Sequence, residues 1–318
     1  MDYHDMLDAT GLVAMDLMAT TVRTVVLCSH PRSTLDHADA WLGAGKHFGQ
    51  ADYTVGMSDK RVSVHADPVT DEQLVGQAKA LAQQLSLGYA TPSLMMLTLT
   101  ADRLELRLRD DKGKPVSCDL RKLDTQSPAG RSLKQPLTKA LGIKKRSDLP
   151  LRVLDATAGW GEDTWLMHAQ GCYVHALERN PVVAALLADA LGRALGDATL
   201  PTDELCVRQG CALDWLRHWH ERYPAESAWS NIDVVYLDPM FPTGRKTAQR
   251  KPMLVLHDLV GEDLDAAALV PLALQVATRR VVVKRPPKAP ALLPDPVVSH
   301  GGKGVRYDVY IPGISKSQ

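Results

Sequence analysis

The sequence has no apolar run long enough to cross a membrane. The best stretch, residues 12 to 28, is interrupted by Asp16 and Arg23, whereas a spanning helix needs about 18 or more apolar residues in a row. A basic leader is also missing, because the first ten residues carry three aspartates and no Lys or Arg, the opposite of a secretory signal peptide. We therefore expect a cytoplasmic protein with no membrane partner.

Cysteine is scarce and has no paired spacing. The five cysteines are an odd number without a C-x-x-C pair, which fits neither a disulfide framework nor a structural zinc site. His218 and His220 are two residues apart, so they cannot share one face of a helix. We expect no metal, and reduced cysteines that pack as small apolar residues: Cys28, Cys118, Cys172, Cys206 and Cys211.

Net charge is zero in total but not along the chain. The chain has 37 basic and 37 acidic residues, yet residues 103 to 146 hold 13 Lys or Arg against 5 Asp or Glu. Residues 231 to 318 hold 12 against 8, and residues 1 to 75 hold 5 against 11. Clustered positive charge is typical of a surface that contacts phosphates. A solvated face is the alternative interpretation of the segment from 103 to 146.

From residue 151 the chain alternates short apolar runs with amphipathic stretches, as in a parallel sheet with crossover helices. Asn180 followed by Pro181 is a strong helix start. We predict an α/β domain with a mostly parallel, doubly wound sheet. Its strands are expected at residues 153 to 154, 173 to 177, 232 to 237, 280 to 284 and 306 to 311.

A smaller α+β region precedes this domain. Residues 97 to 108 alternate apolar and polar side chains, which predicts strands. Turn residues at 111 to 115 indicate that the chain then folds back as a hairpin. A short basic helix is expected over residues 133 to 143, ending near Gly142.

A glycine-containing loop follows the first strand of the α/β domain. Asp155, Gly159 and Gly161 form a D-x-x-x-G-x-G pattern, and Thr164 stands where a dinucleotide fingerprint needs a third glycine. The pattern is that of the S-adenosylmethionine loop in Rossmann-like methyltransferases. Glu178 ends the next strand, where a carboxylate can accept both ribose hydroxyls of an adenosine. A surface glutamate favoured by the helix dipole is the alternative.

The tetrapeptide Asp238-Pro239-Met240-Phe241 follows an apolar strand, so we expect it beside the glycine loop. It resembles the D/N-P-P-F/Y motif of methyltransferases that modify exocyclic amines of bases. Asp238 would accept the amine N–H bonds and orient its lone pair, and Phe241 would stack on an extruded base. A strand-end turn with a capping aspartate is the alternative. Basic residues follow this motif and the next strand: Arg245, Lys246, Arg250, Lys251, Lys284, Arg285 and Lys288.

A family resemblance joins these pieces. The stretches DATAGWGED, LERNPVVAALL, VVYLDPMFP, RRVVVKRP and KGVRYDVY are similar to the RsmJ family, the small-subunit ribosomal RNA guanine-N2 methyltransferases, over about residues 75 to 312. The resemblance implies a Rossmann-like class I methyltransferase that uses S-adenosyl-L-methionine. It implies 16S rRNA or the small ribosomal subunit as partner, and methylation of a guanine N2 near the 3' end of that RNA.

The resemblance also implies site residues in this sequence. The family often has a serine pair where this chain has Cys211 and Ala212. These two side chains do not replace the serine hydroxyls, so we expect them to contact the cofactor through their backbone. The expected cofactor-binding set is Asp155, Gly159, Gly161, Glu162, Asp163, Glu178, Arg179, Cys211, Ala212 and Asp238. The expected catalytic residues are Asp238, Pro239 and Phe241, and the expected RNA-binding residues are Lys246, Arg250, Lys284 and Arg285.

We predict three segments: an acidic N-terminal extension of unknown role (1 to 74), a small basic α+β region that is a candidate for RNA binding (75 to 147), and the methyltransferase domain (148 to 318). Two other functions stay open. The enzyme could methylate another exocyclic amine, such as adenine N6 or a protein amide. The chain could instead be a non-catalytic RNA-binding assembly factor on the same fold. A nicotinamide-dependent oxidoreductase is disfavoured by Thr164.

Overall fold

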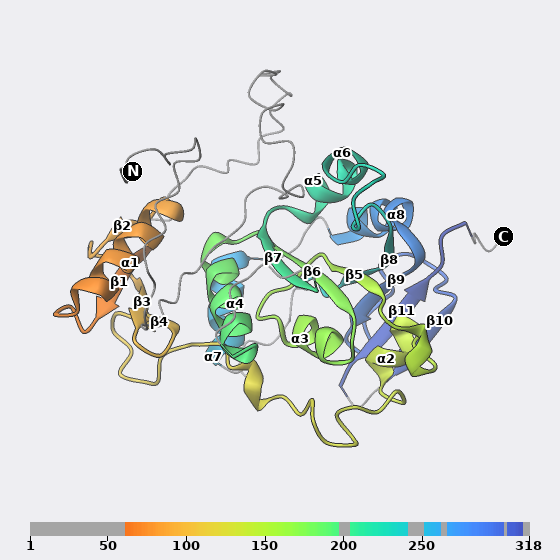
Figure 1. Cartoon of the computed structure of the whole chain (residues 1–318), viewed down its shortest axis with the longest axis horizontal. Coiled ribbons are helices and arrows are strands. Elements are labelled where there is room, and N and C mark those ends of the chain that lie inside the picture. Colours follow the sequence, from red (N-terminus) through yellow and green to blue (C-terminus); the bar gives the residue numbers. More distant parts are fainter. Residues whose placement is uncertain (1–60, 197–203, 241–250, 262–265, 302–303, 314–318) are drawn as a thin grey trace, which may run out of the picture.

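The computed structural model describes residues 61–196, 204–240, 251–261, 266–301 and 304–313. These residues form two sheets with helices packed around them (Figure 1). Most of the expected N-terminal extension lies outside the described residues. Among the described helices, none combines the length and the apolar character that a bilayer-spanning segment requires.

The smaller sheet has the strand order β2-β1-β3-β4. It begins at Val62, within the segment that we grouped with the N-terminal extension. Strands β3 and β4 pair antiparallel, whereas β1 pairs with β3 in parallel through the crossover helix α1, which Asp71 caps. The elements are β1 (Val62–Asp67), α1 (Glu72–Gln84), β2 (Gly88–Tyr89), β3 (Met95–Thr100) and β4 (Leu104–Leu108).

The turn at residues 111 to 115 brings the chain back to β4, as predicted. The returning segment does not form a full strand. Only Val116 pairs, through an isolated antiparallel bridge to Leu106. Pro115 has no N–H to donate, which prevents a longer ladder at this point. The expected hairpin is therefore reduced to a single bridge.

A connecting segment then crosses to the larger sheet through η1 (Leu120–Lys122), α2 (Pro136–Leu141) and η2 (Arg146–Asp148). Helix α2 is shorter than the predicted 133 to 143. Proline is favoured at the first helical position, so the helix begins at Pro136. It ends at Gly142, whose φ of +86° is a left-handed cap.

The larger sheet confirms the predicted α/β architecture. Its strand order is β10-β11-β9-β8-β5-β6-β7. Strands β5 to β9 are parallel to one another, and β11 is antiparallel to both of its neighbours, β9 and β10. Helix α4 begins at Pro181 after the N-cap residue Asn180, as expected. The strands are β5 (Arg152–Asp155), β6 (Tyr173–Glu178), β7 (Leu205–Gln209), β8 (Ile232–Leu237), β9 (Ala277–Arg285), β10 (Val298–Gly301) and β11 (Arg306–Tyr310). The helices are α3 (Glu162–Ala169), α4 (Pro181–Ala194), α5 (Ala212–Arg217), α6 (Trp219–Arg222), α7 (Lys251–Val260) and α8 (Ala266–Val276).

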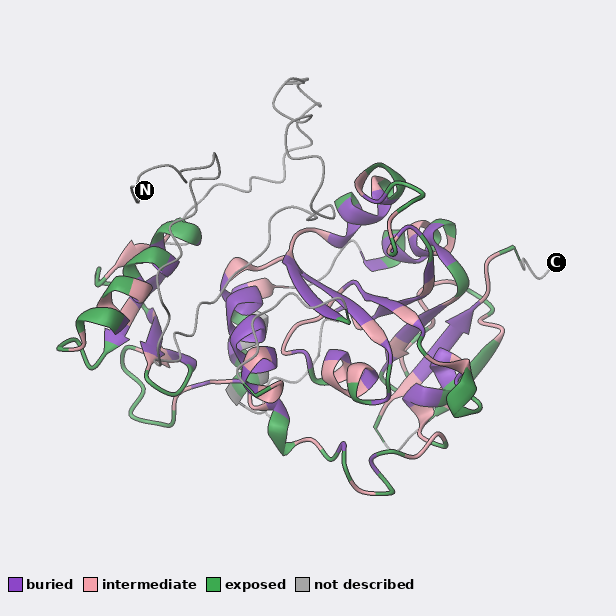
Figure 2. Cartoon of the chain, in the orientation of Figure 1, coloured by how far each residue is buried: buried purple, intermediate pink, exposed green. Residues whose placement is uncertain are grey.

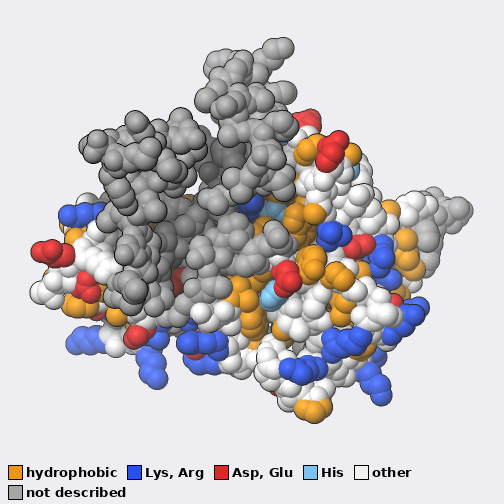
Figure 3. Space-filling view, viewed as in Figure 1, with side chains coloured by type: hydrophobic (Ala, Val, Ile, Leu, Met, Phe, Trp, Pro, Cys, Tyr) orange, Lys and Arg blue, Asp and Glu red, His pale blue; other side chains and the backbone are white. Residues whose placement is uncertain are grey.

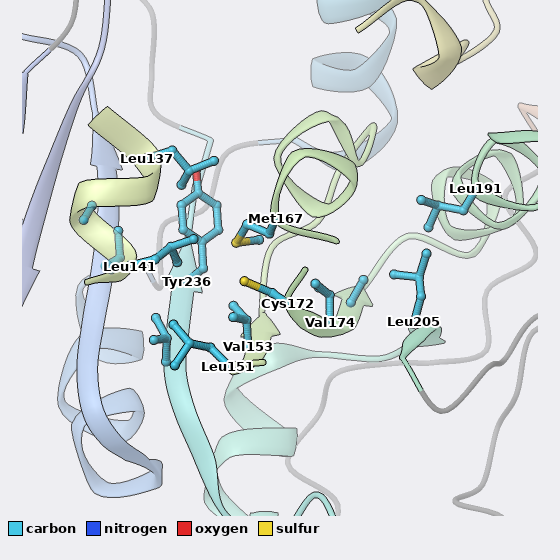
Figure 4. Close-up of a cluster of buried hydrophobic side chains, with 14 of the residues drawn as sticks. Leu137, Leu141, Leu151, Val153, Met167, Cys172, Val174, Leu191, Leu205 and Tyr236 are labelled. Carbon is cyan, nitrogen blue, oxygen red and sulfur yellow. The ribbon is translucent and has the colours of Figure 1, made fainter. Parts of the chain in front are cut away.

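Helices cover both faces of this sheet, and its central strands are buried (Figure 2). One face packs against α2, α3 and α4, where Tyr236 of β8 lies between Leu137 and Met167 (Figure 4). The other face packs against α5, α6 and α8. Helix α4 is buried on most sides because the smaller sheet covers its outer surface. Val182 and Leu186 of α4 belong to the core that the smaller sheet shares with α7.

Candidate active site

A cavity of about 360 Å³ lies at the carboxyl ends of the parallel strands. The chain leaves β5 toward β6 on one side and later returns to β8 on the other, and ligands of open α/β sheets bind where the strand order reverses in this way. The structure brings thirteen of the residues singled out from the sequence into this cavity wall: Asp155, Gly159, Gly161, Glu162, Asp163, Glu178, Arg179, Cys211, Ala212, Asp238, Pro239, Lys284 and Arg285.

Three expected site residues, Phe241, Lys246 and Arg250, lie outside the described part of the chain. Their roles stay predictions from the sequence. Within the described ranges, no group of three or more His, Cys, Asp or Glu side chains has the arrangement of a metal site.

The glycine loop joins β5 to α3. Asp155 is buried at the strand end, where its Oδ2 accepts the Thr164 hydroxyl at 2.5 Å. Burial raises the pKa of Asp155 to about 7, although the bond from Thr164 opposes the shift. Gly161 has a φ of +75°, and a Cβ there would lie 2.1 Å from the Leu187 side chain. Glycine is therefore required for this turn to pack on α4.

Glu178 ends β6 and faces the glycine loop. The residue is 5% exposed. Its Oε2 accepts the N–H of Gly159 at 3.0 Å, and Oε1 accepts the N–H of Asn180 at 2.7 Å. Each carboxylate oxygen can accept more than one bond. The edge that lines the cavity can therefore accept hydroxyls as well, which fits the ribose contact expected from the sequence.

Residues 210 to 212 complete the wall after β7. The N–H of Gly210 donates to the carbonyl of Glu178 at 2.9 Å. Cys211 is the N-cap of α5 but makes no side-chain cap hydrogen bond. The backbone contact between residues 211 and 212 and the cofactor stays a prediction.

The end of β8 carries Asp238, whose backbone N–H donates to Thr157 Oγ1 at 2.6 Å. Its side chain is 39% exposed, and Oδ2 lies 2.9 Å from Lys284 Nζ. The same ammonium lies 2.7 Å from Asp163 Oδ2, which also accepts the Tyr236 hydroxyl at 2.6 Å. Lys284 thus joins α3, which follows the glycine loop, to the residues that follow β8.

Lys284 and Arg285 end β9 and lie in the cavity wall, and both have partners within the protein. Lys284 is engaged by two carboxylates inside the cavity. Arg285 is 4% exposed, and its Nε and Nη2 donate to the Pro290 carbonyl at 3.0 and 2.6 Å. These contacts do not favour a bond from either side chain to an RNA phosphate, and the assignment of Lys284 and Arg285 to RNA binding stays a prediction.

Sequence reasoning missed Tyr236 and Thr157. Tyr236 lies two residues before Asp238 in an apolar strand, and nothing local separates it from a packing residue. Thr157 lies in the glycine loop, but no local pattern indicates that its hydroxyl bonds to Asp238. The residues Gly304 and Val305, before β11, also line the cavity.

Known proteins with similar sequences are methyltransferases. The family model "Putative SAM-dependent methyltransferase" matches residues 80–312. Ribosomal RNA small subunit methyltransferase J of Thioalkalivibrio sulfidiphilus is 40% identical over 268 residues, which cover 81% of this chain and 100% of that relative. The protein of the same name from Marinobacter nauticus is 39% identical over 250 residues, covering 74% of this chain and 87% of the relative.

A solved structure agrees with these matches. The crystal structure of a SAM-dependent methyltransferase from Neisseria gonorrhoeae is 30% identical with a TM-score of 0.57, and it covers 80% of this chain and 98% of its own. The predicted fold, enzyme class and cofactor, S-adenosyl-L-methionine, are therefore confirmed. The chain belongs to the RsmJ family that its motifs indicated, the ribosomal RNA small subunit methyltransferase J family of S-adenosylmethionine-dependent enzymes.

Proposed function

We propose that this enzyme transfers a methyl group to the exocyclic N2 of a guanine near the 3' end of 16S rRNA. The name of the relatives supports small-subunit RNA as the substrate, and the guanine N2 follows from the family that the motifs resemble. The observation that carries the proposal is the partly exposed carboxylate of Asp238 at the cofactor cavity, in the motif expected for exocyclic amines.

The cavity residues fit S-adenosylmethionine. A volume of about 360 Å³ is within the usual range for small-molecule sites. Glu178 would accept the ribose hydroxyls, and the backbone of Gly159 and Gly161 lets the ligand approach the loop. The proposed cofactor set also includes Asp155, Glu162, Asp163, Arg179, Cys211, Ala212 and Asp238. When bound, the cofactor supplies a methyl group on an electrophilic sulfonium.

Asp238 would act on the substrate amine. The lone pair of a guanine N2 is delocalised into the ring, so the amine is a poor nucleophile. A carboxylate that accepts its N–H bonds orients the lone pair toward the methyl group, and this positioning supplies most of the rate enhancement. Pro239 would fix the loop and Phe241 would stack on the base. Lys246 and Arg250 would contact the RNA backbone.

Exposed cations support an RNA surface on the basic region from 75 to 147. Lys and Arg side chains gather along the lower edge of the molecule in Figure 3, the edge along which the yellow segment between β4 and α2 runs in Figure 1. Helix α2 packs on β10 and β11, and the residues before β11 line the cavity. RNA on this surface would therefore reach the cofactor site. The exposed cations of η1, α2 and the loops beside them are Arg121, Lys122, Arg131, Lys134, Lys139, Lys144, Lys145 and Arg146.

The experiment that tests this function presents the protein with labelled S-adenosylmethionine and one of three acceptors: small-subunit RNA free or in subunits, adenine-rich RNA, or total protein. Label in N2-methylguanosine of the small-subunit RNA supports the proposal. Label in N6-methyladenosine or in protein would instead identify another exocyclic amine. RNA binding without transfer would indicate an assembly factor.

A further inference from the structure

The register of the central strands places a lysine beside the proposed catalytic carboxylate. Leu237 of β8 pairs with Val283 of β9, so the next residues, Asp238 and Lys284, follow at the same edge of the sheet. Lys284 Nζ lies 2.9 Å from Asp238 Oδ2 and 2.7 Å from Asp163 Oδ2. One ammonium therefore bridges Asp238, which follows β8, and the first turn of α3.

The groups around this ammonium are mainly acidic. Asp155 lies at the end of β5 and is buried. Asp163 of α3 accepts the hydroxyl of Tyr236, a residue of β8. Burial together with Asp163 and Asp238 raises the pKa of Tyr307 on β11. Burial opposes the charge of Lys284, yet Asp238 and Asp163 raise its pKa above the ordinary value. Lys284 is therefore cationic throughout the physiological pH range.

The other two cations of the described cavity wall donate to backbone carbonyls. Arg179 Nη2 donates to Val260 O at 3.1 Å, and Arg285 donates to Pro290 O. Lys284 forms ion pairs with two carboxylates, those of Asp163 and Asp238. Only 23% of its side chain is exposed, so water screens these contacts less than it screens a surface ion pair.

We propose that Lys284 is a positioning residue for the methyl transfer. Its ammonium holds the Asp238 carboxylate ionised and oriented toward the substrate amine. The contact of the same ammonium with Asp163 ties Asp238 to the cofactor side of the cavity. This inference rests on the proposed function of Asp238. Without the ammonium, the neighbouring carboxylates of Asp163 and Asp238 would repel each other. Asp238 would then take up a proton or rotate away, and a protonated carboxyl accepts the amine N–H less well.

The test compares Lys284→Met, Lys284→Arg and the control Lys288→Met, in which an exposed lysine four residues further along is removed. The readout is the pH dependence of kcat/KM for RNA methylation. We expect Lys284→Met to shift the acid limb of this profile to higher pH, by about one pH unit or more. Lys284→Arg restores the wild-type limb, and Lys288→Met leaves it unchanged. An unchanged acid limb in folded Lys284→Met overturns the proposal.

A second readout needs no RNA and separates this inference from the proposed function. S-adenosylmethionine carries a sulfonium charge that S-adenosylhomocysteine lacks, so calorimetry of both ligands reports the electrostatic potential beside the methyl group. We expect Lys284→Met to increase the preference for S-adenosylmethionine by about threefold or more, because a neighbouring positive charge is removed. If the wild type methylates no RNA, the proposed function fails, and the ratio still tests whether the charge of Lys284 lies beside the cofactor's methyl group. An unchanged ratio overturns the proposal, and an increased ratio supports this placement of the charge.

Discussion

The carboxylate of Glu178 accepts a hydrogen bond from the N–H of Gly159 at 3.0 Å, so the end of β6 holds the glycine loop that follows β5. The second carboxylate oxygen accepts the N–H of Asn180, the residue that caps α4. One side chain therefore fixes the loop, the start of the next helix and one wall of the cofactor cavity. Its replacement should affect ligand binding and local structure together.

Glu178→Ala should weaken S-adenosylmethionine binding by at least about tenfold, because hydrogen bonds to a charged acceptor contribute about 1.5 to 3 kcal/mol. Calorimetric titration measures the change, at a temperature at which thermal melting shows the variant folded. Glu226→Ala removes an exposed glutamate before β8 and serves as the matched control. An affinity within twofold of the wild type would exclude Glu178 from the cofactor site.

Gly161→Ala should lower the free energy of unfolding by about 1 to 3 kcal/mol, since it combines an unfavourable φ with overpacking. The added Cβ would lie 2.1 Å from Leu187. Gly196 has nearly the same φ, +76°, but no atom within 4 Å of an added Cβ. Gly196→Ala therefore reports the backbone cost alone. Urea unfolding of both variants checks this, and equal losses would contradict the packing argument.

Asp155 should make stability depend on pH. Burial raises its pKa from 3.8 to about 7, so the folded state binds more protons than the unfolded state between these values. The free energy of unfolding therefore falls as pH rises through this window, by an amount on the order of a few kcal/mol. Asp155→Asn removes this contribution. The variant's stability relative to the wild type should rise between pH 4 and pH 7 and level off above.

Denaturant unfolding at several pH values measures that difference. If the stability difference between Asp155→Asn and the wild type stays constant from pH 4 to pH 8, the carboxyl is ionised over the whole range and the proposed effect of burial is wrong. The Thr164 bond would then dominate, and Thr164→Val would be the next variant to examine.

RNA binding should become less salt-dependent when the basic surface is neutralised. Lys122→Gln with Lys144→Gln should reduce the slope of log affinity against log salt by about 0.7 to 0.9 for each RNA phosphate that the protein no longer neutralises. Arg217 is an exposed cation of α5, on the opposite face of the sheet. Arg217→Gln should leave the slope unchanged. Equal slopes for both variants would place the RNA elsewhere.

Several site residues could be predicted because the rule that places them is general. Parallel strands end at one edge of the sheet, so Asp155, Glu178 and Asp238, each at or after a strand end, had to lie close together. Asn180 and Pro181 fixed the start of α4 through local hydrogen bonding and a preset φ. These features depend on a few neighbouring residues, which a sequence displays directly.

The partners of Lys284 and Arg285 could not be predicted in the same way. Arg285 is buried because residues 286 to 290 fold back and present the Pro290 carbonyl to it. Lys284 points at Asp163, which lies 121 residues earlier in the chain. A run of cations in the sequence therefore looked like an RNA surface. Only the tertiary arrangement separates exposed cations from those that neutralise carboxylates.

Nucleoside analysis of small-subunit RNA tests the central claim most directly. RNA from a strain that lacks this methyltransferase, free or in subunits, is incubated with labelled S-adenosylmethionine and either the wild type or Asp238→Ala. The wild type should produce N2-methylguanosine. Asp238→Ala should produce none while its cofactor affinity stays within about threefold, because Asp238 acts chiefly on the amine. Absence of N2-methylguanosine with the wild type, or equal amounts with Asp238→Ala, would contradict the proposed reaction.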